Sequence, residues 1–331
     1  MADGDSEEAE KKGRGRLGIL KDIAFAFLIV GIVFGGLFAY TQVYPPLVVV
    51  ESASMQHSDD VSSVGVIDTG DLVLVQSAPT RPTVVTWIEG RVTGHATYGD
   101  YGDVIVFRKP NSPSDPTPVI HRALMYIVPN GSDAYDIPDL AGWPLSLRWE
   151  GVARGGAPTQ SPYGLQSVTI HGMGWQGNLN ITFDLLDFKA QDPVNRNVTG
   201  YITMGDNNAY DVCAPSRPCG TGVLKPYDFQ WVVPQGNILG RARGEIPWFG
   251  LLKLTLDPAR SGTKCCDGWG DPLAPRNSWD SLTIALPLVF GAPFIVEGGL
   301  WAWGKFITPR LRKRRGAKTD QVAAADPVEP R

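Results

Sequence analysis

An uncharged apolar run near the start of the chain limits the possible folds more than any other feature. Residues 23–40 read IAFAFLIVGIVFGGLFAY and carry no charged side chain, which is close to the roughly 20 apolar residues needed to cross a bilayer. A signal peptide is the alternative, but the run is long for one, and no clear small-x-small cleavage site follows. We therefore expect a retained transmembrane helix at 23–42, preceded by a cytoplasmic tail at 1–22.

A second apolar segment lies near the other end of the chain. Residues 282–303 contain two prolines and Glu297 but end in Trp301 and Trp303, a residue type that favours membrane interfaces. Basic residues precede the first run and follow the second, so the positive-inside rule puts both termini in the cytoplasm. We expect a second transmembrane helix at 282–303, a basic cytoplasmic tail at 304–331 and an extracytoplasmic domain at 43–281.

The segment between the two apolar runs has the pattern of a mainly β domain. The chain has 38 glycines and 27 prolines, which favours turn-rich structure, and short β-branched and aromatic runs alternate with turn residues. Residues 129–197 have few of the chemical features found on either side, so we interpret them as an inserted subdomain. The expected strands are 48–51, 72–76, 84–88, 104–108, 119–127, 167–170, 181–186, 201–204, 230–233 and 238–244.

One short pattern occurs twice in this domain. Gly70-Asp71 and Gly102-Asp103 are each followed by four apolar residues. An aspartate that caps a turn explains each copy, and the apolar run predicts a strand buried on both faces.

The cysteines and the net charge indicate the redox compartment of the protein and limit its partners. Cys213, Cys219, Cys265 and Cys266 allow three disulfide pairings, and an oxidising compartment suits them better than a metal site, because no Cys-x-x-Cys motif or nearby histidine completes a zinc set. The net charge of −4 points to no polyanionic partner. We expect no metal, no cofactor and no nucleic acid.

A candidate nucleophile follows the first expected strand. Ser54 lies among small residues that would let a peptide backbone approach, and Met55 could bury its side chain and fix the turn. A serine nucleophile also needs a base to take its proton and donors to hold the oxyanion.

Four histidines are available as that base. His57 is too close in sequence to reach back to Ser54 comfortably, and His95 and His171 lie in Gly-rich segments that we expect to be exposed. His121 lies inside an apolar strand, where its ring would be partly desolvated. A hydrogen-bonded strand histidine without catalytic function is the alternative for His121.

The third group of candidates is the polar turn at residues 203–211. Asp206 and Asp211 could cap backbone amides, which is a sufficient structural reason for them, or could orient an imidazole. Calcium is a weaker alternative, because the spacing is not that of an EF-hand loop.

The order of these pieces resembles the type I signal peptidases, in the archaeal and endoplasmic-reticulum branch where histidine replaces a catalytic lysine. The matching order is an apolar run, Ser54-Met55, two Gly-Asp strands, His121-Arg122 and a Gly-Asp-Asn-Asn box at residues 205–208. The likeness covers residues 48–211, apart from the insertion, and 238–244. Ala53 and His57 stand where that family usually has glycine and proline.

The resemblance implies a signal-peptidase-like β ectodomain and a set of roles. Ser54 would be the nucleophile and His121 the general base, with Asp211 or Asp206 as the orienting acid. The family's second aspartate usually lies six residues after the first, whereas Asp211 lies five after Asp206. The main-chain amide of Ser54 and the hydroxyl of Ser52 would hold the oxyanion.

The implied activity is cleavage of N-terminal signal peptides from exported preproteins after small residues. The partners would be those preproteins, the lipid bilayer and the protein translocation machinery, at an archaeal plasma membrane or the endoplasmic-reticulum membrane, with the catalytic domain on the extracytoplasmic side. Two alternatives stay open. One is a lysine base, with Lys109 or Lys189 as candidates, and the other is a noncatalytic ectodomain for adhesion or assembly.

Overall fold

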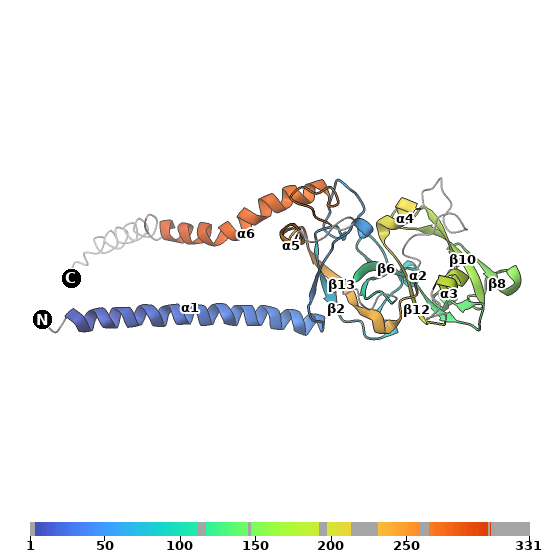
Figure 1. Cartoon of the computed structure of the whole chain (residues 1–331), viewed down its shortest axis with the longest axis horizontal. Coiled ribbons are helices and arrows are strands. Elements are labelled where there is room, and N and C mark those ends of the chain that lie inside the picture. Colours follow the sequence, from blue (N-terminus) through green and yellow to red (C-terminus); the bar gives the residue numbers. More distant parts are fainter. Residues whose placement is uncertain are drawn as a thin grey trace, which may run out of the picture. The chain divides into compact units, whose positions relative to one another are not determined.

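The dominant element is a large antiparallel β-sheet (Figure 1). The computed structural model describes residues 4–110, 117–144, 147–191, 197–212, 231–257, 265–303 and 305. Within these ranges eleven strands join in the order β1-β2-β13-β5-β6-β7-β10-β8-β9, with β11 paired to β10 and β12 paired to β6. A separate hairpin is formed by β3 and β4. The expectation of a mainly β domain is confirmed.

The strands are mostly short. Their bounds are β1 (Leu47–Val49), β2 (Leu72–Gln76), β3 (Ala96–Thr97), β4 (Asp100–Tyr101), β5 (Val104–Phe107), β6 (Val119–Pro129), β7 (Tyr135–Asp136), β8 (Trp149–Ala153), β9 (Pro158–Thr159), β10 (Leu165–Met173), β11 (Leu179–Asp184), β12 (Gly200–Met204) and β13 (Ile238–Ile246).

Helices flank and connect the strands. The α-helices are α1 (Gly4–Thr41), α2 (Trp87–Thr93), α3 (Leu185–Gln191), α4 (Asp206–Val212), α5 (Gly250–Leu256) and α6 (Arg276–Ala302). The 3₁₀ turns are η1 (Ala53–Met55), η2 (Arg81–Thr83), η3 (Pro138–Gly142), η4 (Arg154–Gly156) and η6 (Gln235–Asn237).

The two apolar runs of the sequence both form helix. Within α1, Ile23–Thr41 is long and apolar enough to cross a membrane. In α6, Arg276–Ala292 and Phe294–Trp301 meet that test only as a pair, bent by 42°. Because α6 meets the test only as a bent pair, the second transmembrane helix stays a prediction. The chain divides into one compact unit up to Ser278 and a second from Trp279 onward.

The apolar helix α1 ends against the sheet. Ser77 donates its main-chain N–H to the carbonyl of Thr41 at 2.7 Å, and the Gln76 side chain donates to the carbonyl of Tyr40 at 3.4 Å. Both bonds lie at the end of β2, which ties the start of the β domain to the last turn of α1.

The segment at 129–197 extends the sheet that precedes it. Its strand β7 pairs with the far end of β6 and with β10. Ile170 and Ile181 of this segment belong to one buried cluster with Leu124 and Ile202 of the main sheet. An independent inserted subdomain is therefore not confirmed, because the segment shares a core with β6 and β12.

The strand expected at 84–88 is wrong, because a helix starts there. Thr86 caps α2, accepting the N–H of Glu89 with its side chain, while the Glu89 carboxylate accepts the N–H of Thr86 at 2.9 Å. This reciprocal pair is the capping box that marks helix starts, and Thr-x-x-Glu was readable in the sequence. The strand expected at 230–233 is reduced to a single bridge between Val233 and Tyr201, and Gln230 lies outside the described ranges.

The two Gly-Asp strands differ in burial. All four residues of β5 are buried, as expected, whereas β2 alternates between buried and half-buried positions. Both aspartates cap turns and also hold distant segments. Asp71 accepts N–H groups from Asp68 at 2.8 Å and Trp248 at 3.0 Å, and Asp103 accepts the N–H of Val85 at 3.0 Å.

Candidate active site

Ser54 lies in the 3₁₀ turn η1, directly after the first strand. Gln56 closes the turn by donating its N–H to the carbonyl of Ala53 at 3.1 Å. The hydroxyl of Ser52 donates to the hydroxyl of Ser54 at 3.4 Å. The structure thus brings the predicted nucleophile and the predicted oxyanion helper side by side, with Ser54 half-buried.

The three residues after Ser54 are anchored in three different places. Met55 is buried in the hydrophobic core, as its place in the sequence predicts. The Gln56 side chain accepts the N–H and the hydroxyl of Thr69, at 3.2 and 2.7 Å. His57 Nε2 lies 3.2 Å from Asp206 Oδ2. These contacts fix the turn although Ala53 and His57 replace the usual glycine and proline of the resembling family.

Gly205 forms the floor under Ser54. A Cβ atom at Gly205 would lie 2.4 Å from the carbonyl oxygen of Ser54 and 3.0 Å from its Cβ. Real Cβ atoms do not approach a carbonyl oxygen so closely, so only glycine fits here. The nucleophile turn therefore rests directly on the link between β12 and α4.

The end of the β12–β6 ladder lies close to both Ser54 and His121. The last pair of the ladder is Met204 with Arg122; Gly205 directly follows Met204, and His121 directly precedes Arg122. The turn η1 contacts both α4 and β6. The turn that carries Ser54 and the strand that carries His121 are therefore neighbours.

His121 is buried in β6. The residue is 6 % exposed, and its ring meets the ring of Phe107 edge-on, with centroids 6.3 Å apart. The sequence predicted a desolvated strand histidine, and its burial is confirmed.

Asp206 is bound to Arg122. The guanidinium donates to both carboxylate oxygens, from Nε at 2.8 Å and from Nη2 at 2.5 Å, and the two side chains are 1 % and 4 % exposed. Burial alone would favour the neutral acid, but the charge and hydrogen bonds of Arg122, with His57, lower the pKa of Asp206. Asp206 is therefore an anion that neutralises a buried cation.

This pairing separates the roles of the two candidate acids. Arg122 and His121 are consecutive in β6, so their side chains point to opposite faces of the strand, and Asp206 is held on the Arg122 face. Asp211 lies near the end of α4, but its side chain is outside the described part of the structure. Its role as orienting acid stays a prediction.

His57 connects the nucleophile turn to its surroundings through both ring edges. Nε2 faces Asp206, and a Cβ at Gly99 would lie 2.7 Å from Cε1 and 3.2 Å from Nδ1. One ring face stacks on Trp175 at 4.6 Å with an interplanar angle of 7°. His57 thus connects the turn to α4, and its Nε2 is directed at Asp206.

The other two histidines each lie within hydrogen-bond distance of a carboxylate. His95 Nε2 lies 2.8 Å from Asp103, and His171 Nε2 lies 3.2 Å from Glu150. Both histidines are half-buried, and His171 lies on the strand β10. The expectation that both occupy exposed loops is therefore wrong.

Sequence reasoning missed two aromatic residues next to the site. Trp175 comes from the turn between β10 and β11, and its ring lies 5.4 Å from that of Tyr210 in α4. The Tyr210 hydroxyl accepts the N–H of Gln176 at 2.8 Å. A tryptophan between two glycines of one turn, Gly174 and Gly177, was the available signal.

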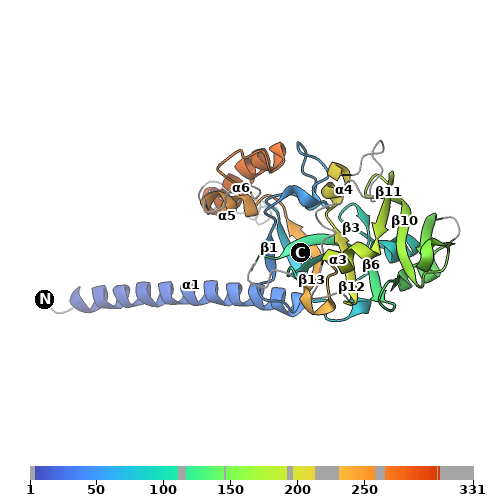
Figure 2. The same cartoon turned by 45° about the vertical axis from the view of Figure 1, so that its right-hand side comes forward.

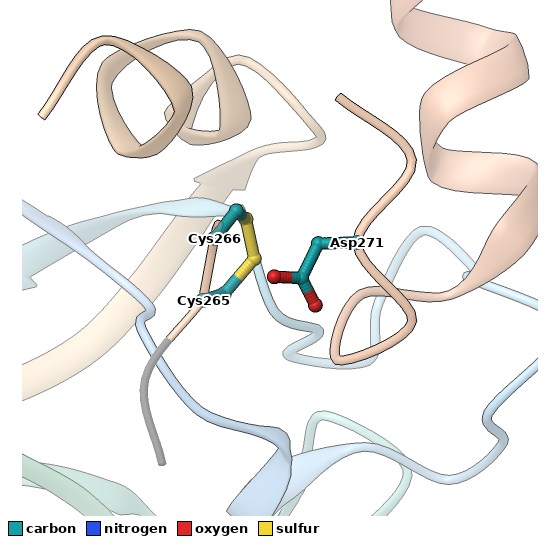
Figure 3. Close-up of side chains that lie close together, drawn as sticks. All are labelled: Cys265, Cys266 and Asp271. Carbon is teal, nitrogen blue, oxygen red and sulfur yellow. A yellow bond between two sulfur atoms is a disulfide. The ribbon is translucent and has the colours of Figure 1, made fainter. Parts of the chain in front are cut away.

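The cysteine pair lies in the loop before α6, and its backbone is bonded to the segment between β1 and Ser54. Cys265 and Cys266 form a disulfide with each other, and the N–H of Cys265 donates to the carbonyl of Glu51 at 2.9 Å. Figure 3 shows Asp271 beside this pair. Cys213 and Cys219 lie outside the described ranges.

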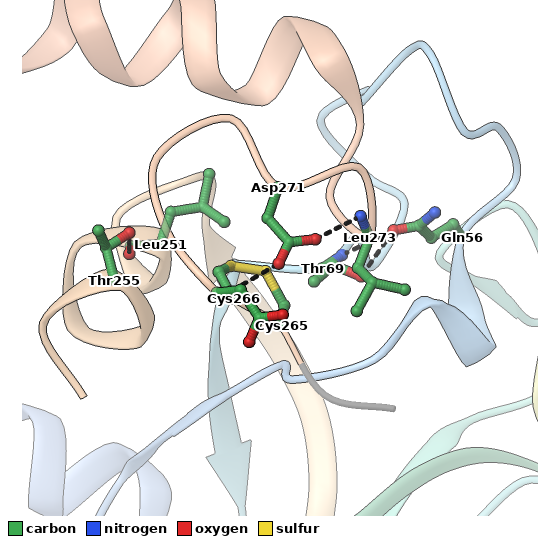
Figure 4. Close-up of a disulfide and its surroundings, with 9 residues drawn as sticks. Gln56, Thr69, Leu251, Thr255, Cys265, Cys266, Asp271 and Leu273 are labelled. Atoms are coloured by element: carbon green, nitrogen blue, oxygen red, sulfur yellow. Dashed lines mark hydrogen bonds between the residues drawn. A yellow bond between two sulfur atoms is a disulfide. The ribbon is translucent and has the colours of Figure 1, made fainter. Parts of the chain in front are cut away.

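Cys265, Cys266 and Asp271 are close enough together to hold a metal ion, with ligand atoms within 4.8 Å. The sulfurs are already bonded to each other, however, and both oxygens of Asp271 accept main-chain N–H groups, from Asp267 at 2.7 Å and Leu273 at 2.9 Å (Figure 4). The three residues are thus a disulfide between adjacent cysteines and a carboxylate that caps its own loop.

The arrangement around Ser54 suits acyl transfer. It combines a serine hydroxyl on a fixed turn, a second hydroxyl beside it, a buried imidazole on β6, a strand that the turn contacts, and a first-turn N–H that has no acceptor inside its own helix. No family model matches this sequence, and no curated protein sequence matches it. The functional argument therefore rests on the chain's own residues.

Proposed function

We propose that this protein is a membrane-anchored serine endopeptidase that cleaves N-terminal signal peptides from exported preproteins after small residues. The observation that supports the proposal is the packing of Ser54 on Gly205, directly after the end of the ladder that pairs β12 with the His121 strand β6. A serine nucleophile needs a base close by, and His121 is our candidate for it.

The chemistry follows the serine-protease scheme. Ser54 Oγ attacks the scissile carbonyl while His121 takes its proton, and the Ser54 N–H with the Ser52 hydroxyl stabilises the oxyanion. His121 then donates the proton to the leaving amine, which departs as the mature chain. Water, deprotonated by the same imidazole, hydrolyses the acyl-enzyme. Asp211 would hold the imidazolium that forms in each half of the reaction.

The membrane anchor serves this reaction. A site tethered by α1, and by α6 if it crosses as well, meets a substrate in the same bilayer at high effective concentration. With both termini cytoplasmic, the β domain faces the extracytoplasmic side of an archaeal plasma membrane or of the endoplasmic-reticulum membrane. Preproteins arriving from the translocation machinery would be the partners.

The proposal is tested with the full-length protein in detergent micelles and a preprotein substrate. Ser54→Ala should abolish cleavage and labelling by a small fluorophosphonate, with a loss of at least about 10³-fold. His121→Ala should do the same, whereas His121→Lys tests whether a primary amine can replace the imidazole.

His171→Ala is the matched control, because this histidine pairs with Glu150 on a strand beyond the site. It should leave cleavage unchanged. Persistent processing by Ser54→Ala protein would rule out the serine mechanism. A wild-type protein that neither cleaves nor labels would favour the noncatalytic ectodomain.

A further inference from the structure

The turn between β10 and β11 brings an aromatic residue of the 129–197 segment to the border of the proposed site. Trp175 is half-buried. It stacks on His57 at 4.6 Å and meets Tyr210 at 5.4 Å, and a Cβ at neighbouring Gly174 would lie 2.7 Å from the Tyr210 hydroxyl. The hairpin is thus seated closely on both partners.

Both partners of Trp175 are coupled to the nucleophile turn. His57 follows Ser54 by three residues and is bound to Asp206. Tyr210 lies in α4, which begins directly after Gly205, the floor of Ser54. A single residue, His57, therefore connects Trp175 to the turn that holds Ser54.

The strand order shows where the β10–β11 hairpin lies in the sheet relative to α1. The membrane helix α1 is bonded to the end of β2, whereas β10 is reached beyond β13, β5, β6 and β7. In Figure 1 and Figure 2 alike, β6 lies between α1 and β10. A chain that leaves the bilayer beside α1 and crosses Ser54 continues toward the β10–β11 hairpin.

We propose that Trp175, backed by His57, forms the subsite for the first residues of the mature chain, just after the scissile bond, and favours bulky apolar side chains there over acidic ones. The inference rests on the proposed peptidase function. In a signal peptide the apolar segment stays in the bilayer and the mature chain leads away from it, so the mature side is the side that meets the hairpin. An indole partly open to solvent offers apolar area and a π face, which suits apolar residues.

Two substrates with the same signal segment separate this subsite from the catalytic centre. One is a peptide that extends several residues past the cut, with Phe or Asp at the first position, and the other ends at the cut in a p-nitroanilide. Wild type should have a lower KM for the Phe peptide than for the Asp peptide. Trp175→Ala should raise KM for the Phe peptide about threefold to tenfold, reduce the difference in KM between the Phe and Asp peptides, lower kcat/KM for the anilide less than for the Phe peptide, and be partly rescued by Trp175→Phe.

Tyr163→Ala is the control, because it removes an exposed aromatic side chain from the same segment and should change neither substrate. Equal KM for the Phe and Asp peptides in wild type overturns the subsite, and this comparison does not depend on folding of the alanine variant. Equal loss on the extended and anilide substrates in Trp175→Ala also overturns it, since the residue would then be structural. Wild type that cleaves neither the extended peptides nor the anilide, and does not react at Ser54 with a fluorophosphonate, overturns the peptidase function itself.

Discussion

At the scale of single residues, the buried charge of Arg122 needs the most compensation from its neighbours. Its guanidinium is buried and bonded to Asp206, and it also donates to a ring of backbone carbonyls at Thr97, Tyr98, Asp100, Tyr101 and Gly102. A buried ion costs several kcal/mol to desolvate unless a partner and hydrogen bonds compensate it. Asp206 supplies the only full negative charge in that set of direct bonds.

Asp206→Asn should therefore destabilise the protein strongly. It removes the carboxylate that bonds the buried cation directly and leaves Asp100, whose carboxylate lies 4.0 Å from Nε, so the expected loss is about 3–5 kcal/mol of unfolding free energy. Urea unfolding of the full-length protein in detergent micelles measures this loss.

Asp133→Asn is the matched control, since Asp133 pairs with Arg154 at 2.8 Å with both side chains about half exposed. An exposed pair contributes roughly 0–1 kcal/mol, so this variant should unfold close to wild type. Similar losses for both variants would contradict a special role for the buried pair.

At the scale of elements, the link between β12 and α4 is the joint that positions the site. The strand brings Gly205 under Ser54, and the helix begins at once with Asp206, which holds His57. One short segment therefore supports the nucleophile turn at two points.

Gly205→Ala should separate activity from stability. The added methyl group would meet the Ser54 carbonyl at 2.4 Å, so the turn must move, and a displacement of about 1 Å at a catalytic group costs on the order of 10² in rate. We expect kcat/KM for the preprotein to fall by about that factor, with a smaller relative change in the urea midpoint.

Gly236→Ala serves as the control, because nothing lies within 4 Å of a Cβ at that position. It should keep wild-type activity. Full activity in Gly205→Ala would show that the close packing seen under Ser54 is not needed for function.

At the scale of the whole molecule, buried acids make stability depend on pH. Burial raises the pKa of Asp71 to about 8 and that of Asp68 to about 6, with smaller opposing effects from their hydrogen bonds. Their ordinary value is 3.8. Between about pH 4 and pH 8 the folded protein therefore binds more protons than the unfolded chain.

The sign of the effect follows from that difference. Unfolding free energy should fall as pH rises from about 4 to about 8, by about 1.4 kcal/mol per pH unit for each group that is protonated only in the folded state. Asp71→Asn cannot ionise, so its unfolding free energy should fall less steeply than that of wild type over the same range. Urea titrations at pH 5, 6, 7 and 8 measure both slopes.

The exposed Asp60 provides the comparison, and Asp60→Asn should keep the wild-type slope. If Asp71→Asn and wild type have parallel pH profiles, Asp71 is ionised in the folded protein at neutral pH.

The sequence by itself determined the features that depend on local pattern. An apolar run without charges predicts the membrane helix at 23–42, because spanning the bilayer requires length and apolarity only. Strands such as 72–76 and 201–204 follow from β-branched composition. The capping box at Thr86 was equally local and was overlooked, which made residues 84–88 look like a strand.

Only the tertiary structure decided which groups meet. The sequence ranked Asp211 only slightly above Asp206 as the orienting acid, because their nearness in the chain says nothing about the direction of each side chain. Alternation along β6 sends Arg122 and His121 to opposite faces, and the pairing of Met204 with Arg122 brings Asp206 to the arginine. Trp175 reaches His57 through a hairpin more than 100 residues along the chain, and no local pattern encodes a contact whose geometry depends on the strand order of the sheet.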